Sequence, residues 1–217
     1  MIQNKILAHH VYERIREMIG DGALAPGQRI SRKELEEILG VSQTPINDAL
    51  SRLAGERFIE QEYRRGYYVK RVSADEMIHL FEYRAATEGM AARLCAESAP
   101  MEDRESLRSF FEPFELPIPE SARQEYRHRD TAFHRRILEL AANPMLSEMN
   151  EAHGYMIKSY QKGLLRDPNE TLSEHHAIVE AIIAGRPAQA QEAMSFHLLR
   201  TRDTLIRQRE EIGDREE

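Results

Sequence analysis

Two short helical segments separated by one glycine constrain the fold of this chain more than any other feature of its sequence. Ser31 and Glu34 have the three-residue spacing of a capping box, which predicts a helix that begins there and ends near Gly40. Ser42 is then the expected N-cap of a second helix over residues 43–55. Since glycine adopts a left-handed backbone readily, we expect a tight turn between the two helices.

The segments on either side of this helix pair complete a known structural plan. Apolar residues at helical spacing predict a preceding helix that ends at Gly20. After the pair, the short runs 58–62 and 67–72 are typical of the strands of a β-hairpin with Gly66 at its turn. A helix, a helix-turn-helix and a hairpin make a winged helix-turn-helix. We expect residues 1–72 to form this domain, with the hairpin as its wing.

From residue 73 onward the strand signals end, and every periodic segment is typical of a helix. Prolines, glycines and asparagines separate these segments and predict where the helices stop. The chain is therefore predicted to be mainly α, with an N-terminal winged helix-turn-helix and a C-terminal all-α antiparallel helical bundle over residues 73–217. We expect six helices in this bundle, over residues 74–99, 101–112, 120–142, 144–163, 171–185 and 187–211.

The composition excludes several classes of protein. The chain is 41% hydrophobic and 31% charged, with a mean hydropathy of −0.61. No apolar run approaches the ~20 residues of a membrane span, and the N-terminal residues lack the features of a signal peptide. Cys95 is the one cysteine, so no internal disulfide can form. We expect a cytoplasmic protein with no membrane association, which is neither a disulfide scaffold nor a disordered chain.

The charge is unevenly distributed between the two predicted domains. Residues 1–72 hold 12 Lys and Arg against 10 Asp and Glu, whereas the remainder holds 18 against 27, which gives the formal net charge of −7. A weakly basic N-terminal domain can approach phosphate while the acidic remainder keeps the protein in solution. The charge balance is thus compatible with a nucleic-acid partner. The net charge of +2 on residues 1–72 is nevertheless too small to indicate a basic DNA-binding surface by itself.

The predicted helix 43–55 has one apolar face, which directs its polar residues outward. Gln and Asn can hydrogen-bond an adenine edge in the major groove, and Arg can bind guanine or phosphate. An ordinary solvated helix face would have the same polarity, but the capping box, the glycine turn and the basic wing tip favour DNA. The candidate DNA-binding residues are Arg32, Lys33, Ser42, Gln43, Thr44, Asn47, Arg52, Arg64, Arg65 and Gly66.

Two stretches of this region resemble the DNA-binding domain of the GntR family of bacterial transcription regulators. They are PGQRISRKELEEILGVSQTPINDALSRL and YRRGYYV, and the resemblance covers about residues 5–71. It implies a dimer that places two recognition helices in adjacent major grooves of a palindromic operator in double-stranded DNA. It also implies that the wing tips lie at the minor groove.

The chain departs from the family pattern at four positions. The family usually has arginine where this chain has Lys33, Gln43 and Asn47, and glycine where it has Arg57. A guanine-reading arginine contributes about 1–3 kcal/mol of discrimination between bases. We therefore predict an operator that differs from the common family half-site, with more adenine under the recognition helix.

Four residues of the C-terminal half form a candidate metal site. Asp130 and His134 lie four apart on a predicted helix, and His175 and His197 lie on the last two helices. One carboxylate and three imidazoles suit a first-row divalent ion, Zn²⁺ first and Ni²⁺ or Mn²⁺ as alternatives. An Asp–His pair at this spacing is more often a surface hydrogen bond, and spacing across three helices does not establish convergence. Apolar neighbours of His134 and His197 favour an inward orientation.

A second resemblance covers residues 76–205, which are similar to the all-helical ligand-binding domain of the FadR branch of the GntR family, called the FCD domain. The matching pieces are EYRAATEGMAARLCAE, DTAFHRRILELAANPML and EHHAIVEAIIAGRPAQAQEAMSFHL. The resemblance implies that the metal ligands are Asp130, His134, His175 and His197. Six helices in place of seven would group the chain with the shorter, VanR-like members.

The same resemblance makes Arg84 a candidate effector-binding residue, with its helical neighbour Glu88 beside it. Arginine can clamp the carboxylate of a metal-bound organic acid with two parallel hydrogen bonds. Arg84 and Glu88 are also four residues apart, so an ordinary ion pair along the helix explains both residues equally well.

These observations predict a DNA-binding regulator, most simply a repressor, that responds to a small carboxylic or sugar acid. A metal-dependent hydrolase is one alternative, but the chain has no H-E-x-x-H, no G-x-S-x-G and no phosphate-binding loop, so we expect that it is not an enzyme. A metal-ion sensor that uses the same four residues is a second alternative. A third is an interaction protein in which the four residues bind nothing.

Overall fold

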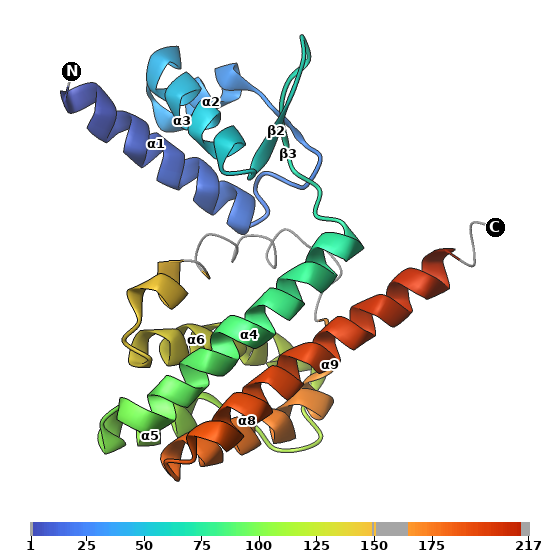
Figure 1. Cartoon of the computed structure of the whole chain (residues 1–217). Coiled ribbons are helices and arrows are strands. Elements are labelled where there is room, and N and C mark those ends of the chain that lie inside the picture. The colour runs from blue at the N-terminus through green and yellow to red at the C-terminus, as the bar shows by residue number, and fades with distance from the viewer. Residues whose placement is uncertain (1, 149, 151–164, 214–217) are drawn as a thin grey trace. The chain divides into compact units, whose positions relative to one another are not determined.

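The computed structural model describes residues 2–148, 150 and 165–213 of the chain. These residues divide into two compact units, with the boundary along the chain between Ser73 and Ala74, and the units are described separately below. The described residues are mainly helical, with one three-stranded antiparallel sheet in the first unit, as predicted (Figure 1).

The three helices of the first unit begin and end where the local signals place them. They are α1 (Ile2–Gly20), α2 (Arg32–Leu39) and α3 (Gln43–Gly55). The Oγ of Ser31 accepts a hydrogen bond from the backbone N–H of Glu34 at 3.3 Å. Gly40 has a φ of +65° and its N–H donates to the carbonyl of Glu36, which closes α2 and turns the chain into α3. Ser42 occupies the N-cap position of α3, but its side chain makes no cap hydrogen bond.

The sheet contains the predicted hairpin and one strand that the sequence did not indicate. The strands are β1 (Arg29–Ile30), β2 (Ile59–Glu62) and β3 (Gly66–Val69), in the order β1–β3–β2. Ile30 pairs with Tyr67, and Ile59 pairs with Val69. All four side chains are buried against the helices. A strand of two residues is too short to show an alternating pattern, so β1 follows from its pairing with β3 and not from its own sequence.

Arg57 shows why the family usually has glycine after the recognition helix. Its φ is +63°, in the left-handed region that costs a residue with a Cβ about 1–2 kcal/mol. This conformation takes the chain from the end of α3 into β2. The residue type has therefore changed at this position, while the backbone keeps the conformation that glycine favours.

The second unit is built from helices, and α4 and α9 run side by side along it (Figure 1). The helices are α4 (Ala74–Ser98), α5 (Met101–Ser106), α6 (Arg123–Leu140), α8 (Pro168–Ile183) and α9 (Pro187–Gly213). Residues 144–148 and 150 are also helical, and the rest of the helix predicted over 144–163 lies outside the described residues. The predicted number of six helices is therefore not tested.

Two of the predicted helices include a 3-10 turn in the structure. The helix predicted over 101–112 stops at Ser106 and continues as a 3-10 turn, η1 (Leu107–Phe110). Ser106 and Ser109 each hydrogen-bond a carbonyl three residues back, which competes with the α-helical pattern, and Pro113 disfavours a helical residue before it. The helix predicted over 120–142 opens with another 3-10 turn, η2 (Glu120–Ala122).

The helix predicted to begin at residue 171 begins one turn earlier, because Asp167 caps it. The Asp167 carboxylate accepts from the backbone N–H of Asn169 at 2.9 Å, and Pro168 occupies the first turn.

The contact between α4 and α9 is close because small residues line it. A Cβ at Gly89 would lie 2.3 Å from the Oγ of Ser195, and that hydroxyl donates to the carbonyl of Ala85 at 2.8 Å.

Cys95 is fully buried in α4, and burial raises the pKa of its thiol to about 11. None of the helices that the structure describes combines the length and the apolar content of a membrane span.

Candidate functional site

The recognition helix α3 has the two faces that the sequence predicts. Ile46, Leu50 and Leu53 are fully buried in the core of the first unit. Gln43 and Thr44 are exposed on the opposite side. Of the other predicted DNA-binding residues outside the wing, Asn47 is half-buried, and the exposed ones are Arg32, Lys33, Ser42 and Arg52. We call these seven residues, together with Arg64, Arg65 and Gly66 of the wing, the DNA-reading surface, because all of them are predicted to contact DNA.

Arg52 belongs to this surface and also makes contacts within the unit. Its Nε donates to Glu56 at 2.9 Å, and its guanidinium lies over the ring of Tyr12, 3.9 Å from the ring centre. The Tyr12 hydroxyl donates to the same Glu56 carboxylate. Arg52 therefore links α3 to α1, and this role is independent of its predicted contact with DNA.

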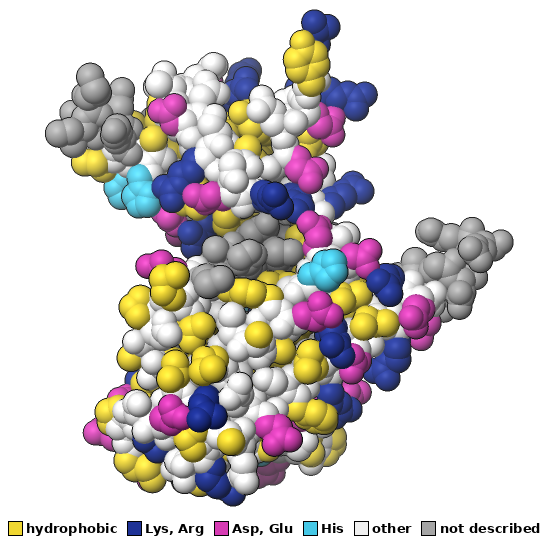
Figure 2. All heavy atoms as spheres, viewed as in Figure 1, with side chains coloured by type: hydrophobic (Ala, Val, Ile, Leu, Met, Phe, Trp, Pro, Cys, Tyr) yellow, Lys and Arg dark blue, Asp and Glu magenta, His cyan; other side chains and the backbone are white. Residues whose placement is uncertain are grey.

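The outer end of the β2–β3 hairpin carries the predicted basic wing tip. Tyr63 is 84% exposed, and the guanidinium of Arg64 lies 5.1 Å from the centre of its ring. Arg65 is exposed and pairs with Glu62 at 3.4 Å. Figure 2 shows dark-blue basic and yellow hydrophobic side chains together at the tip of this hairpin. Gly66 has a φ of +111°, which is the turn role predicted for it.

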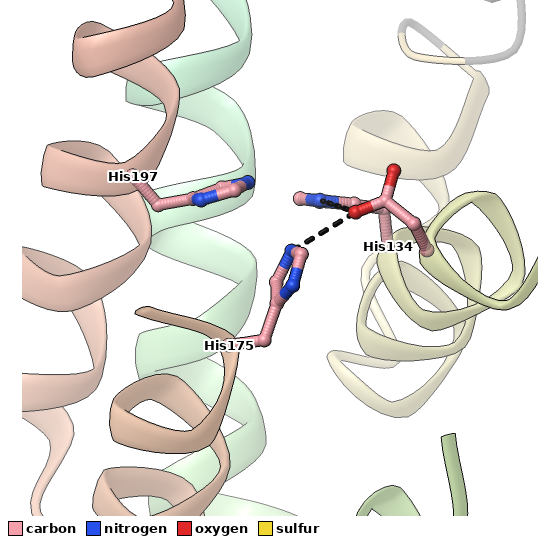
Figure 3. Close-up of side chains that lie close together, drawn as sticks. His134, His175 and His197 are labelled. Atoms are coloured by element: carbon pink, nitrogen blue, oxygen red, sulfur yellow. Dashed lines mark ion pairs between the residues drawn. The ribbon is translucent and has the colours of Figure 1, made fainter. Parts of the chain in front are cut away.

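The four candidate metal ligands converge in the second unit. Asp130 and His134 lie on α6, His175 on α8 and His197 on α9, and Figure 3 shows the three rings pointing toward one another. One ligand atom from each residue lies within 4.8 Å of the other three. The three histidines are buried and Asp130 is partly exposed. We call this group the Asp–His cluster.

Each imidazole of the cluster uses its Nδ1 for a contact with a residue outside the cluster. The Nδ1 of His134 lies 2.6 Å from a Glu88 oxygen, and the Nδ1 of His197 lies 2.8 Å from a Glu174 oxygen. The Nδ1 of His175 lies 2.8 Å from the Tyr126 hydroxyl. Each Nε2 is thus the ring nitrogen left for a metal, which is the usual arrangement of histidine ligands and their hydrogen-bonding partners.

The chemistry of the cluster residues suits a divalent cation. The Nε2 of His175 is fully buried without a hydrogen-bond partner, although it lies 2.9 Å from an Asp130 oxygen. A buried imidazole nitrogen beside a carboxylate oxygen is a donor set that suits a divalent cation. Burial lowers the pKa of His175, and it lowers the pKa of His197 to about 3, so both rings are neutral and hold a free electron pair at neutral pH. Burial raises the pKa of Asp130, but its contact with His175 and its electrostatic interactions with the histidines outweigh this and hold the pKa well below its usual range.

An aromatic wall holds His175 in place. The ring of Phe111 stacks on the imidazole with centres 4.2 Å apart and planes 7° from parallel, and Phe133 meets it edge-on. Phe111 directly follows the 3-10 turn that replaces the end of the predicted helix 101–112. The irregular backbone at that point therefore places a side chain of the site.

The two glutamates that contact the cluster are themselves held by arginines. Arg84 donates to Glu88 at 2.5 and 3.3 Å, so the ion pair along α4 that the spacing allowed is present. Arg166 donates to both oxygens of Glu174, at 2.7 and 2.8 Å. Burial raises the pKa of each glutamate, but the arginine and histidine neighbours outweigh it and hold both values at about 2. Both carboxylates are therefore ionised at neutral pH.

Sequence reasoning did not single out Tyr126, Glu174 or Arg166. Tyr126 lies four residues before Asp130 on the same face of α6, and that spacing was a usable signal. Glu174 directly precedes His175, and adjacent side chains of a helix point in different directions, so the sequence did not place Glu174 near the cluster. Its contact with His197 comes from the packing of α8 against α9. Arg166 lies before α8 and carries no pattern at all.

Comparison with known proteins identifies both units. A family model described as "FCD domain" matches residues 79–200, more than half of the chain, and the model "Bacterial regulatory proteins, gntR family" matches residues 7–69. This chain belongs to the GntR family. More fully, it is a GntR-family DNA-binding transcriptional regulator with a C-terminal FCD domain, as the sequence resemblance implied.

The similarity of this GntR-family regulator to other transcriptional regulators extends over most of their length. It is 28% identical to a probable D-xylose utilization operon transcriptional repressor of Paenarthrobacter nicotinovorans, over 88% of this chain and 85% of the relative. It is 26% identical to the HTH-type transcriptional regulator LutR of Bacillus subtilis, over 87% and 96%. The solved structure of E. coli McbR/YncC has the same fold, with a TM-score of 0.71 at 21% identity over 93% of this chain and 98% of that one. These homologues are regulators and not enzymes, so the protein is not the hydrolase that was one alternative.

Proposed function

We propose that this regulator is a repressor whose affinity for its operator is controlled by a small organic acid bound at a divalent metal in the FCD domain. The observation that carries the proposal is the convergence of one ligand atom from each of Asp130, His134, His175 and His197 within 4.8 Å. The buried Nε2 of His175, which lies 2.9 Å from an Asp130 oxygen in poor hydrogen-bond geometry, supports a metal at this position.

The four residues of the Asp–His cluster would hold the metal, with Zn²⁺ first and Ni²⁺ or Mn²⁺ as alternatives. When bound, the ion supplies a positive centre that attracts an anion, and an ion that takes more than four ligands keeps positions for it. Glu88, Glu174 and Tyr126 hold the three rings by their Nδ1 atoms. The protein therefore offers a rigid set of donors for the ion.

Arg84 is the residue that we propose for the far end of the effector. Its side chain is 11% exposed and contacts Glu88, which in turn contacts His134 of the cluster. Two of its nitrogens donate to Glu88, and a guanidinium has five N–H donors, so Arg84 can keep Glu88 and still bind a carboxylate. A small carboxylic or sugar acid has the charge for this position.

We further propose that residues 1–72 and 73–217 act as separate DNA-binding and effector-binding domains in a cytoplasmic homodimer. Two copies of the DNA-reading surface would bind the half-sites of a palindromic operator, with α3 in the major groove and the wing at the minor groove. The relative named as a xylose-operon repressor supports repression as the direction of control. Ordering of the FCD helices around the acid would favour one arrangement of the two DNA-binding domains over another.

An operator-binding assay tests this proposal. Purified full-length protein is analysed for metal and mixed with DNA from upstream of its own gene, and candidate carboxylic and sugar acids are added. A coupling of about 1–3 kcal/mol predicts a change of roughly 5–150-fold in operator affinity with the correct acid. Acids that bind the protein yet leave operator affinity unchanged would show that the coupling is wrong.

The same assay separates an effector site from a metal-ion sensor. A resident metal survives dialysis, and DNA binding is then independent of free metal. In a sensor the ion exchanges, and operator affinity follows its concentration with no acid present. A protein without stoichiometric metal after purification and metal addition would refute the metal site itself.

A further inference from the structure

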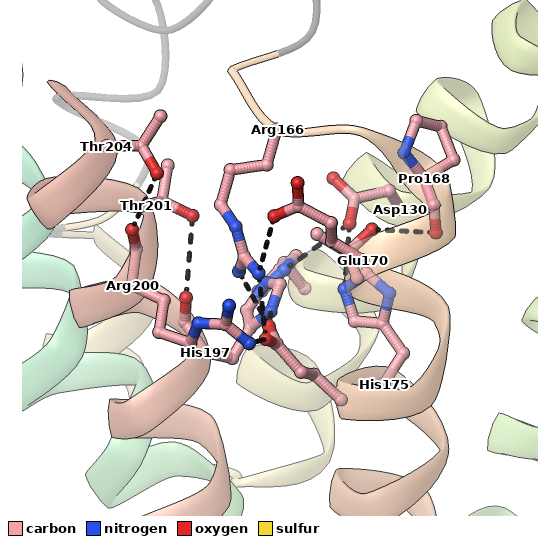
Figure 4. Close-up of polar contacts among 12 residues, drawn as sticks. Asp130, Arg166, Pro168, Glu170, His175, His197, Arg200, Thr201 and Thr204 are labelled. Carbon is pink, nitrogen blue, oxygen red and sulfur yellow. Dashed lines mark hydrogen bonds and ion pairs between the residues drawn. The ribbon is translucent and has the colours of Figure 1, made fainter. Parts of the chain in front are cut away.

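Arg166 is a buried charge with no part in the function proposed above. Its side chain is only 2% exposed, at the connection that leads into α8. An arginine cannot shed its charge, so burial is tolerated only where strong partners compensate for lost water. Figure 4 shows its guanidinium reaching in between α8 and α9 toward His197.

The partner of Arg166 is the carboxylate that contacts His197. Both oxygens of Glu174 accept from Arg166, at 2.7 and 2.8 Å, in the parallel arrangement that is the strongest form of this pair. The oxygen that accepts the 2.7 Å bond also contacts the Nδ1 of His197, at 2.8 Å. Arg200 binds the other oxygen at 2.6 Å, and Glu170 lies 3.5 Å from Arg166. Glu174 is therefore fixed on both of its oxygens.

A second chain of contacts in the cluster has the same order of residue types. Arg84, Glu88 and His134 form an arginine–glutamate–histidine series, as do Arg166, Glu174 and His197. In the first series, arginine and glutamate are neighbours on one helix, so the backbone already holds them together. In the second, the connection before α8 supplies the arginine, α8 the glutamate and α9 the histidine. Arg166 binds both oxygens of this glutamate, whereas Arg200 of α9 binds one of them.

We propose that Arg166 is a positioning residue for the metal ligand His197. By holding Glu174 in one orientation, it keeps the proton of the His197 ring on Nδ1 and directs the Nε2 toward Asp130, His134 and His175. This inference rests on the proposed metal site. It adds a residue outside the ligand set, on a different segment, that sets how tightly the metal is held.

The test compares metal affinity among variants of the full-length protein. Each protein is stripped with a chelator and titrated with Zn²⁺ against a chromogenic chelator. Loss of a residue that supports a ligand typically weakens metal binding 10–100-fold, and we expect that loss for Arg166→Ala. Arg166→Lys keeps the charge but not the two parallel bonds, so it should recover part of the affinity.

Arg123→Ala is the matched control. Arg123 pairs with Asp167 at 2.9 Å and with Glu120 at 2.7 Å, so it anchors the same connection through residues that do not belong to the cluster. We expect its metal affinity to stay within about twofold of wild type, because support for a metal ligand is what changes affinity. An equal loss in Arg123→Ala and Arg166→Ala would overturn the proposal, since it would reduce Arg166 to a general anchor of α8.

A measurement on the metal-free protein covers the case in which Arg166→Ala folds poorly. Long-range proton–nitrogen NMR correlations report which ring nitrogen of a histidine carries the proton. We expect His197 to carry it on Nδ1 in wild type and on a mixture of both nitrogens in Arg166→Lys or Glu174→Gln. The same single form in all three proteins would overturn the proposal.

These outcomes are distinguishable from failure of the proposed function. If wild type takes up no metal in the titration, the metal site itself is refuted. If wild type binds Zn²⁺ and a folded Arg166→Ala binds it equally well, the metal site stands and the role of Arg166 is refuted.

Discussion

The two units of this regulator use polar side chains in opposite ways. In the first unit, the polar residues of α3 lie outside an apolar core, with Gln43 and Thr44 exposed over a fully buried Leu50. In the second unit, the polar groups of the site lie in the interior, since His175 is 0% exposed and Glu88 only 2%. The first unit can therefore change its DNA-reading surface without touching its core, whereas the second cannot change its site without changing its packing.

This difference has a physical basis in what each unit binds in the proposed function. DNA is larger than the domain and is read from outside, so the contacting side chains remain in water until the complex forms. A small anion or a metal ion is bound by enclosing it, which removes the ligands from water and requires a partner for every polar atom. The comparison predicts that substitutions in the second unit affect stability and that those on the DNA-reading surface affect specificity.

The largest effect is expected for Glu88→Ala. The change leaves Arg84 and His134 buried without their shared acceptor, and removal of one partner from a buried pair costs about 3–5 kcal/mol. Urea unfolding of the full-length protein measures the loss. Asp48→Ala, an exposed change on α3, is the control and should stay within about 0.5 kcal/mol. A loss below about 1 kcal/mol for Glu88→Ala would break the comparison between the units.

Asn47→Arg should change specificity and leave the fold intact. Restoring an arginine that the family usually has at this position should add a guanine contact that discriminates by about 1–3 kcal/mol. Because Asn47 lies outside the buried face of α3, the free energy of unfolding should change by no more than about 0.5 kcal/mol. Selection of bound sequences from random DNA measures the preference. Recovery of one operator by both proteins would mean that Asn47 does not read DNA.

The two serines beside the glycine turn sharpen the comparison within one unit. Ser31 caps α2 with a hydrogen bond, so Ser31→Ala should cost about 1 kcal/mol of stability. Ser42 occupies the same position on α3 with no cap bond, so Ser42→Ala should cost less stability but weaken operator binding. Unfolding and DNA-binding curves for both variants measure this. If Ser42→Ala binds the operator as tightly as wild type, the assignment of Ser42 to DNA is wrong.

The smallest effect is expected where one residue serves both fold and surface. Arg52 lies over the ring of buried Tyr12, so Arg52→Ala should cost about 0.5–1 kcal/mol of stability. Arg64 lies over the exposed ring of Tyr63, and Arg64→Ala should leave stability unchanged. Thermal unfolding of the two variants compares them directly. If both melt like wild type, the contact of Arg52 with α1 contributes nothing to the fold.

Local sequence signals sufficed for the first unit. The capping box at Ser31 and the turn at Gly40 depend on residues within a few positions of each other, and the structure has both. The buried face of α3 follows from helical periodicity in the same way. The exception is β1, whose two residues are strands only through their pairing with β3.

Less of the second unit could be predicted, because its site depends on contacts between distant segments. The four residues of the Asp–His cluster were found by residue type and resemblance, but their spacing across three helices did not show that they converge. Glu174 and Tyr126 contact the rings from other turns of helix, and Phe111 does so from an irregular turn. Such neighbours are set by packing, which one sequence does not display.

The burial of Cys95 is useful for site-specific labelling. A thiol that is fully buried and protonated at neutral pH does not react with maleimide reagents, so the natural cysteine need not be removed before labelling. One added cysteine, such as Tyr63→Cys at the wing tip, would carry a single probe on each copy of the chain. In the proposed homodimer, pulsed electron paramagnetic resonance or fluorescence energy transfer between two such probes would then follow the spacing of the DNA-binding domains as acids are added.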